Sequence, residues 1–196
     1  MQGRRKTQAG FSLVELVIVI IVVGLLAVAA LPRFMNVTDE AKKAAIEGVA
    51  GGYATAVLSV RAQWEAYGRP QTDGRNSVSY DGTDFYLTQA SDALSPSIGY
   101  PIALTSKPIE TLVVNDCVAL MDNLLQNPPK VTSVAADVSG GDFLFFVALV
   151  EEDKQQACRY YQLASAGSDG TGSTNVTSGH YFTYQPAKGL VQTDLR

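Results

Sequence analysis

The order of polar and apolar positions along the chain separates a short basic leader from a long hydrophobic segment. Residues 1–10 are polar and include the cluster Arg4-Arg5-Lys6, and an apolar stretch from Phe11 to Leu31 follows directly. As a helix, this stretch measures roughly 31 Å, which is enough to span a hydrocarbon core of about 30 Å. The pattern therefore predicts a hydrophobic N-terminal helix.

The helical pattern continues beyond Pro32 in amphipathic form. Apolar and small residues recur at steps of three or four, with charged residues lying mostly between them. Arg69-Pro70 and Gly74 interrupt the pattern, so one long helix is expected from about Phe11 to Tyr67, with a kink at Pro32. Its apolar stripe consists of Phe34, Val37, Ala41, Ala45, Val49, Tyr53, Val57, Val60 and Trp64.

The remaining two thirds of the chain alternate between short apolar runs and turn residues, which predicts strands with one short helix. Three hairpins are expected: Ser77–Leu87, Phe143–Val150 with Cys158–Leu163, and His180–Gln185 with Leu190–Thr193. The helix is expected over Glu110–Gln126, and a connecting loop over Ser91–Pro108. The second and third hairpins together predict a mainly antiparallel sheet that covers the helical stripe. The fold class is therefore α+β.

Glu15 is a lone carboxylate inside the hydrophobic segment. A charged side chain at a bilayer centre costs at least about 2.5 kcal/mol, so such a residue normally has a partner or a task. In one interpretation, Glu15 lies near the end of a transmembrane helix and reaches the headgroups. In the other, cleavage between Gly10 and Phe11 creates an α-amine that pairs with the carboxylate of a neighbouring copy.

The ends of the hydrophobic segment favour its retention in the mature protein. A secretory signal peptide places small residues at a cleavage site after its apolar core, whereas this segment ends at Leu31-Pro32-Arg33. The basic cluster Arg4-Arg5-Lys6 predicts a cytoplasmic N-terminus, so everything after Pro32 is expected on the other side of the membrane.

Composition narrows the possible functions. Acidic residues exceed basic ones by 19 to 15, and no basic run is long enough to suggest nucleic-acid binding. Cys117 and Cys158 form an even pair on the expected oxidising side, which favours a disulfide over a metal site. His180 is the only histidine, and no nucleophile elbow or phosphate loop accompanies it, so neither an enzyme nor a resident metal or cofactor is expected.

The motif Gly10-Phe11-Ser12-Leu13-Val14-Glu15, the basic leader, the Pro32 boundary and the two late cysteines together resemble a type IV pilin precursor. Within that family, residues 31–36 and 39–42 resemble the mannose-sensitive haemagglutinin (MSHA) pilins. Residues 60–65 and 125–129 are similar to the minor pilins of that group. The resemblance is dense from Arg4 to Phe34 and covers the globular half only in layout.

The resemblance implies a specific maturation and assembly. A prepilin peptidase is expected to cut after Gly10 and to methylate the new amine of Phe11, and Glu15 is expected to draw that amine, or a neighbour's, into register. Gly24 and Pro32 match positions where pilin helices lose order in filaments. The implied partners are other pilin subunits and the inner-membrane assembly machinery, and the implied location is the inner membrane and then an extracellular pilus of a Gram-negative bacterium.

The corresponding layout has four parts: a cleaved leader (residues 1–10), a membrane and assembly helix (11–32), the amphipathic half of the helix (33–68) and a globular head (69–196). Two other function classes remain open. A type II secretion pseudopilin would share the leader and helix and often binds calcium, for which the oxygen-rich loop Ser168–Gly172 is a weak candidate with one carboxylate. A single-pass anchored binding protein would keep its N-terminus intact.

Overall fold

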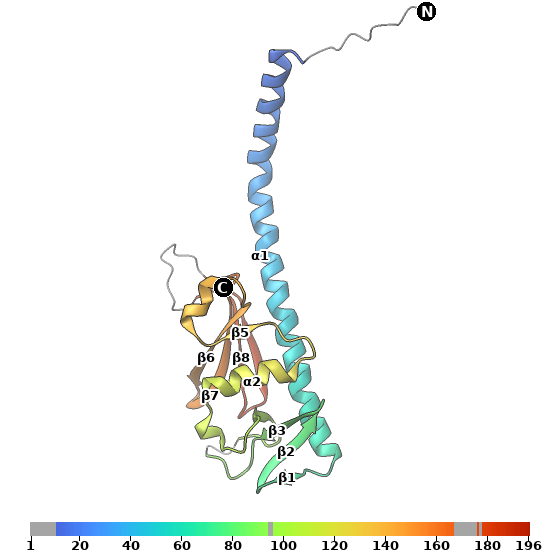
Figure 1. The fold of residues 1–196 in the computed structure, drawn as a ribbon, viewed down its shortest axis with the longest axis vertical. Coiled ribbons are helices and arrows are strands. Elements are labelled where there is room, and N and C mark those ends of the chain that lie inside the picture. The colour runs from blue at the N-terminus through green and yellow to red at the C-terminus, as the bar shows by residue number, and fades with distance from the viewer. Residues whose placement is uncertain (1–10, 94–95, 167–175, 177) are drawn as a thin grey trace, which may run out of the picture. The chain divides into compact units, whose positions relative to one another are not determined.

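A computed structural model of the chain describes residues 11–93, 96–166, 176 and 178–196 (Figure 1). The chain divides into two compact units, Met1–Ala41 and Lys42–Arg196. The first described element is helix α1, which runs from Leu13 to Ala66 and contains Pro32. The predicted long helix is confirmed to within two residues at each end. The order of a long helix followed by two mainly antiparallel sheets confirms the predicted α+β fold class.

In the second unit, the face of α1 that packs on the head begins later than the sequence pattern predicts. Ala45 is exposed, and the buried face starts at Ile46. The earlier members of the predicted stripe, Phe34, Val37 and Ala41, lie in the first unit and are exposed there. Steps of four advance 400° around a helix with 3.6 residues per turn, so a run of such steps drifts around the helix surface. The buried positions instead alternate steps of four and three, at Ile46, Ala50, Tyr53, Val57, Val60 and Trp64.

The end of α1 is closed by a Schellman motif. The amide of Arg69 donates to the carbonyl of Trp64 at 2.9 Å, and the amide of Gly68 donates to the carbonyl of Glu65 at 3.1 Å. Gly68 has a φ of +78°, the left-handed conformation that glycine adopts without a steric penalty. The motif satisfies two of the last helical carbonyls and fixes the direction in which the chain leaves the helix.

A four-stranded antiparallel sheet follows, in the order β1-β2-β3-β4. The hairpin predicted over residues 77–87 is confirmed, with Asp81 and Gly82 in its turn at φ values of +48° and +81°. The predicted loop over 91–108 is wrong in part because it contains β4, which pairs with β3. The strands are β1 (Gln71–Thr72), β2 (Arg75–Tyr80), β3 (Thr83–Leu87) and β4 (Pro101–Ala103).

The predicted single helix over residues 110–126 is two elements. A 3₁₀ turn, η1 (Ile109–Thr111), precedes the helix α2 (Val114–Leu124). Leu112 between them is extended, with a ψ of 135°, so the chain changes direction there. Cys117, Leu120, Met121 and Leu124 form the buried face of α2, at the helical spacing that the sequence shows.

The second sheet has five strands in the order β5-β6-β7-β8-β9. The two predicted hairpins are confirmed, but β6 continues through Glu152, so the turn between β6 and β7 contains only Asp153 and Lys154. The predicted sheet lacks β5, which pairs with β6 in parallel. The elements are β5 (Val131–Thr132), the 3₁₀ helix η2 (Ala135–Gly140), β6 (Phe145–Glu152), β7 (Gln155–Gln162), β8 (Tyr181–Gln185) and β9 (Leu190–Asp194).

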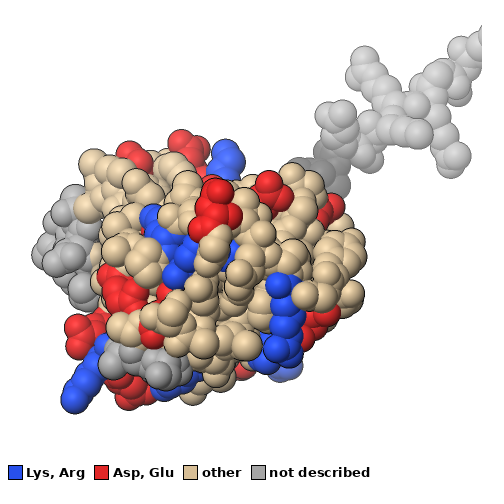
Figure 2. All heavy atoms as spheres, turned by 90° about the horizontal axis from the view of Figure 1, so that it is seen from below, with Lys and Arg blue, Asp and Glu red and all other residues tan. Residues whose placement is uncertain are grey.

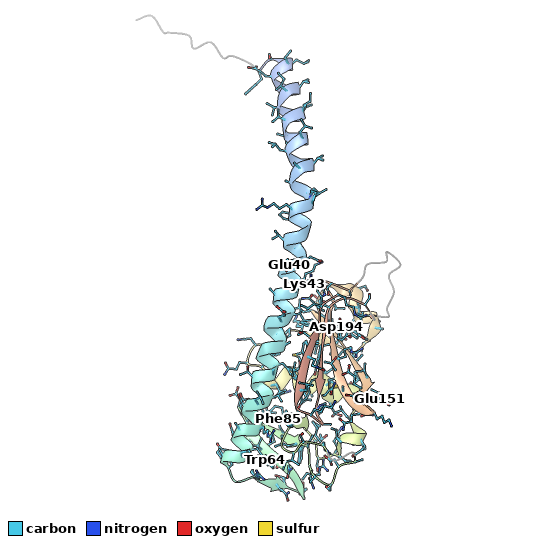
Figure 3. All side chains as sticks on the ribbon, turned by 180° about the vertical axis from the view of Figure 1, so that it is seen from behind. Glu40, Lys43, Trp64, Phe85, Glu151 and Asp194 are labelled. Atoms are coloured by element: carbon cyan, nitrogen blue, oxygen red, sulfur yellow. A yellow bond between two sulfur atoms is a disulfide. The ribbon has the colours of Figure 1, made fainter. Side chains whose placement is uncertain are left out.

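The main core of the head joins α1, α2 and both sheets, with Trp64 and Phe85 among its fully buried side chains (Figure 3). An aromatic cluster lies at its centre. The ring of Tyr160 stacks on that of Phe182 at 4.7 Å, and the ring of Tyr53 contacts both. Such ring contacts add about 0.5 to 1.5 kcal/mol each beyond the area that they bury.

Replacing Gly189 by Ala is expected to lower the free energy of unfolding by about 2 to 3 kcal/mol. Gly189 has a φ of +64°, and an added Cβ would lie 2.0 Å from the ring of Tyr100. Arg61 donates a hydrogen bond to the Tyr100 hydroxyl, which holds that ring in place. Thermal denaturation measures the loss. The control is Gly82→Ala, since Gly82 shares the positive φ but faces open space; equal losses for the two variants would contradict the expected clash.

Candidate functional site

The start of α1 is the first candidate site, and there Ser12 and Glu15 form a capping box. The amide of Ser12 donates to the Glu15 carboxylate at 2.9 Å, and the amide of Glu15 donates to the Ser12 hydroxyl at 3.2 Å. Ser-x-x-Glu is the sequence signature of this motif, so the sequence contains the signal for a capping box, which neither of the two interpretations of Glu15 above uses. A negative charge in the first turn also complements the helix dipole.

The capping box leaves the Glu15 carboxylate able to bind a second donor. A carboxylate has about four lone-pair sites, and the Ser12 amide occupies one of them. Phe11, whose amine cleavage would release, is 89 % exposed and adjoins Ser12. Gly10 and the rest of the leader lie outside the described residues.

The first half of α1 presents an apolar surface. Its large hydrophobic side chains, from Phe11 to Phe34, are exposed. By length and composition, α1 is suited to cross a membrane. A β-carbon at Gly24 would meet nothing within 4 Å, and Pro32 lies within the helix. The proposed flexibility at these two positions stays a prediction.

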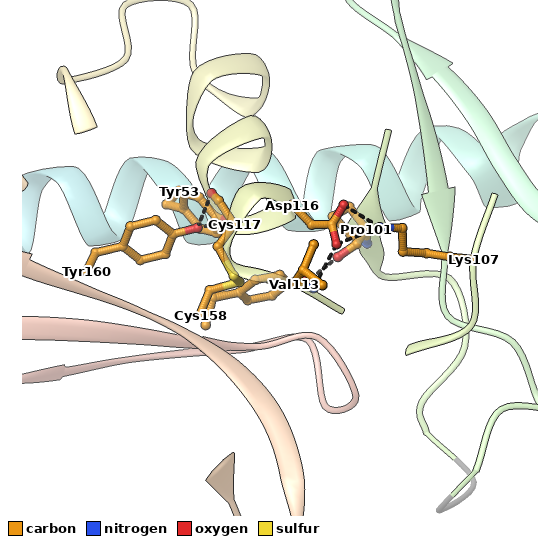
Figure 4. Close-up of a disulfide and its surroundings, with 9 residues drawn as sticks. Tyr53, Pro101, Lys107, Val113, Asp116, Cys117, Cys158 and Tyr160 are labelled. Atoms are coloured by element: carbon orange, nitrogen blue, oxygen red, sulfur yellow. Dashed lines mark hydrogen bonds and ion pairs between the residues drawn. A yellow bond between two sulfur atoms is a disulfide. The ribbon is translucent and has the colours of Figure 1, made fainter. Parts of the chain in front are cut away.

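The predicted disulfide is present and joins α2 to β7 (Figure 4). The Cα atoms of Cys117 and Cys158 are 5.5 Å apart, within the usual range for a disulfide, and both residues are fully buried. The bond closes a loop between residues 41 positions apart in sequence. It therefore fastens the helix to the central part of the second sheet.

A chain of hydroxyl groups runs beside the disulfide. The hydroxyl of Tyr160 donates to the carbonyl of Cys117 at 2.8 Å, and the hydroxyls of Tyr53 and Tyr160 are 3.2 Å apart. Since the Tyr160 proton is directed to Cys117, Tyr53 donates to Tyr160. Burial raises the pKa of both tyrosines, so both stay protonated and able to donate.

An ion pair anchors the first turn of α2 near the same disulfide (Figure 4). The ammonium of Lys107 lies 2.8 Å from each carboxylate oxygen of Asp116, and the amide of Val113 donates to that carboxylate at 2.9 Å. Asp116 is 8 % exposed, so these bonds compensate for the burial of its charge. The site is structural, since every contact holds α2 in place.

Two other candidates from the sequence are His180 and the calcium loop Ser168–Gly172. His180 is buried, and its Nδ1 accepts a hydrogen bond from the amide of Arg196 at 3.0 Å. Among residues 11–93, 96–166, 176 and 178–196, no group of three or more His, Cys, Asp or Glu residues is placed to hold a metal ion. The calcium candidate Ser168–Gly172 lies outside those ranges.

Charges on the head are mixed in sign. On the face that Figure 2 shows, acidic and basic side chains are interspersed. Several basic residues are neutralised by close carboxylates. Lys188 lies 2.5 Å from Asp153, whose pKa it lowers, and Arg159 pairs with Glu152. This arrangement gives no support to a nucleic-acid surface.

Comparison with known proteins finds similarity over part of the chain. Residues 5–31 match the model of the prokaryotic N-terminal methylation motif. The chain is 30% identical over 91 residues to the type IV narrow pilus major component PilA5 of Thermus thermophilus, an alignment that covers 43% of this chain and 78% of that protein. No solved structure matches the chain. The motif, the long apolar helix and this relative agree, and the chain belongs to the type IV pilin family.

Proposed function

We propose that this chain is a structural subunit of a type IV pilus, made as a precursor that a prepilin peptidase cuts after Gly10 and methylates at Phe11. The observation that carries the proposal is the start of α1. A capped first turn containing Glu15 is followed directly by an apolar surface that the chain itself leaves exposed. An apolar surface of this kind is suited first to lipid and then to the helices of other subunits.

In this proposal the four parts of the chain have separate tasks. Residues 1–10 are removed, residues 11–32 hold the subunit in the inner membrane and later in the filament, and residues 33–68 join that segment to the head, residues 69–196. The partners are other pilin subunits, the prepilin peptidase and the inner-membrane assembly machinery. The location changes from the inner membrane to an extracellular pilus of a Gram-negative bacterium.

The finer assignment within this proposal is a minor pilin of the MSHA type that serves surface attachment. Its support is the sequence resemblance over residues 31–36, 39–42, 60–65 and 125–129. The structural role, rather than an enzymatic one, is supported by the family, and the head uses its cysteines for a buried cross-link.

Two alternative functions make different predictions. A type II secretion pseudopilin would share the cleavage but serve protein export, and it would be encoded beside secretion genes rather than pilus genes. A single-pass anchored binding protein would retain residues 1–10. The calcium loop that would distinguish the pseudopilin, Ser168–Gly172, lies outside the described residues, so the encoding genes and the state of the N-terminus distinguish the three functions.

The decisive experiment is mass spectrometry of the N-terminus in protein sheared from the cell surface. The expected mature chain begins at Phe11 and carries one methyl group on its amine. A Gly10→Val variant supplies the matched control, because a peptidase pocket that admits glycine should reject the branched side chain and leave the leader in place. Surface protein that still begins at Met1 would overturn the proposal, as would cleavage of the variant after residue 10.

A further inference from the structure

A groove at the end of the head lies between the exit of α1 and the outer face of the β2–β3 hairpin. Its volume is about 260 Å³. One wall comes from the segment after the helix and the other from β2 and β3. Its lining includes Tyr67, Pro70, Thr72, Ser77, Asp84 and Tyr86.

The first wall is held in place by the end of α1. The Schellman motif at Gly68 and Arg69 fixes the backbone beside Tyr67, whose side chain is 66 % exposed. The carbonyl of Pro70 accepts two hydrogen bonds, from the indole of Trp64 at 3.0 Å and from the amide of Ser77 at 3.2 Å. The backbone that carries this wall is therefore fixed by the end of the helix and by β2.

The second wall follows from strand geometry. Side chains alternate between the two faces of β3, and Phe85 points into the core, so Asp84 and Tyr86 lie together on the opposite face. Tyr86 is paired with Ser77 across the hairpin, and Asp84 with Ser79. The groove thus has a tyrosine on each wall and a carboxylate beside them.

The charges near the groove favour a cation. The two arginines in this region are already paired, Arg69 with Glu65 at 2.7 Å and Arg75 with Asp92 at 2.6 Å. The carboxylates of Asp73, Asp81 and Asp84, in contrast, have no hydrogen-bond or ion-pair partner among the residues that the structure describes.

The polar groups of the groove argue against an anionic ligand. The hydroxyl of Ser77 donates to that of Thr72 at 2.8 Å, and the unpaired carboxylate of Asp84 would repel an anion. Aromatic faces beside a carboxylate instead match an ammonium group with its alkyl chain, through cation–π attraction and a charge-assisted hydrogen bond.

We propose that the groove formed by Tyr67, Pro70, Asp84 and Tyr86 binds an alkyl ammonium group of the kind that a lysine side chain carries. The carboxylate of Asp84 accepts the ammonium hydrogen bonds, and the two tyrosines contact the methylene chain and the cation. This proposal is independent of filament assembly, because the groove belongs to a single head.

The test is an NMR titration of the ¹⁵N-labelled full chain in micelles of an uncharged detergent. The probe is Nα-acetyl-lysine methylamide, and the matched probe is the norleucine analogue, which has the alkyl chain without the charge. Trp64 is the only tryptophan, so its single indole resonance reports on the Pro70 wall. Saturable shifts of this resonance and of the Tyr67 and Tyr86 amides are expected with lysine and not with norleucine.

Variants separate a specific site from general acidity. Asp84→Asn is expected to weaken lysine binding about tenfold or more, because it removes the charge that accepts the ammonium hydrogen bonds. Tyr67→Leu is expected to weaken binding about fivefold through the loss of the cation–π contact. Tyr67 is exposed, so this variant should keep its fold. The control Asp81→Asn removes the same charge outside the groove, at a positive φ that Asn accepts, and should change binding less than about twofold.

Three results would overturn the proposal. The first is equal shifts with the lysine and norleucine probes. The second is unchanged binding in Asp84→Asn when its spectrum otherwise matches that of the wild type. The third is tighter binding of choline than of lysine, which would assign the groove to quaternary ammonium groups instead.

Discussion

Replacing Glu15 by Gln is expected to reduce incorporation of the subunit into filaments by about tenfold or more, while the start of α1 remains intact. Gln serves as well as Glu at the third position of a capping box, so the hydrogen bond to the Ser12 amide can be kept. What is lost is the negative charge. Without this charge the ammonium of Phe11 would be unpaired in a dry environment, which is costly. A loss of about 1.4 kcal/mol in the free energy of assembly already lowers the equilibrium constant tenfold.

The measurement compares variant and wild-type subunits in sheared filaments against the same proteins in the membrane fraction. Ser12→Ala is the matched control, because it removes half of the capping box and keeps the carboxylate; its incorporation should stay within about twofold of the wild type. Normal incorporation of Glu15→Gln together with poor incorporation of Ser12→Ala would show that Glu15 acts only as a cap.

Removing the disulfide with Cys117→Ala and Cys158→Ala together is expected to lower the free energy of unfolding by up to about 4 kcal/mol. The chain-entropy model assigns about this value to a cross-link between residues 41 apart. For a domain of this size, the melting temperature should fall by about 10 °C. Circular dichroism of the full chain in detergent measures the transition.

The reduced wild-type protein is the control for that result. Its midpoint, reached by unfolding and refolding in the presence of a thiol reductant, should match that of the double variant. The folded wild type should resist the same reductant, because both cysteines are fully buried. If the double variant melted within about 2 °C of the oxidised wild type, the cross-link would contribute little to stability.

The elements that sequence reasoning found are those whose side chains carry a strong local pattern. The four strands β6 to β9 are rich in aromatic and β-branched residues and are separated by clear turns, and α2 has apolar residues at helical spacing. The missed strands are short. Strand β5 has two residues, and β4 begins with Pro101 inside a stretch rich in Ser, Pro and Gly, so each is defined by its neighbours rather than by its own composition.

The candidate sites also differ in how far the sequence alone could predict them. Ser12 and Glu15 lie within one helical turn, and their capping box was readable from sequence. The disulfide was predictable because the chain has only two cysteines. The groove was not predictable, since Tyr67 and Asp84 come from different elements and meet only through the Schellman exit of α1 and the register of the β2–β3 hairpin.

The cross-link between α2 and β7 also determines how the head tolerates a broken backbone. The tip of the β6–β7 hairpin, Asp153-Lys154, is exposed and lies between the two cysteines in sequence. A protease that cuts after Lys154 would leave two fragments, but Cys158 would still tie the C-terminal one to Cys117. The strand pairing of β6 with β7 would also remain on both sides of the cut. On a cell surface, a nicked head would therefore stay in one piece.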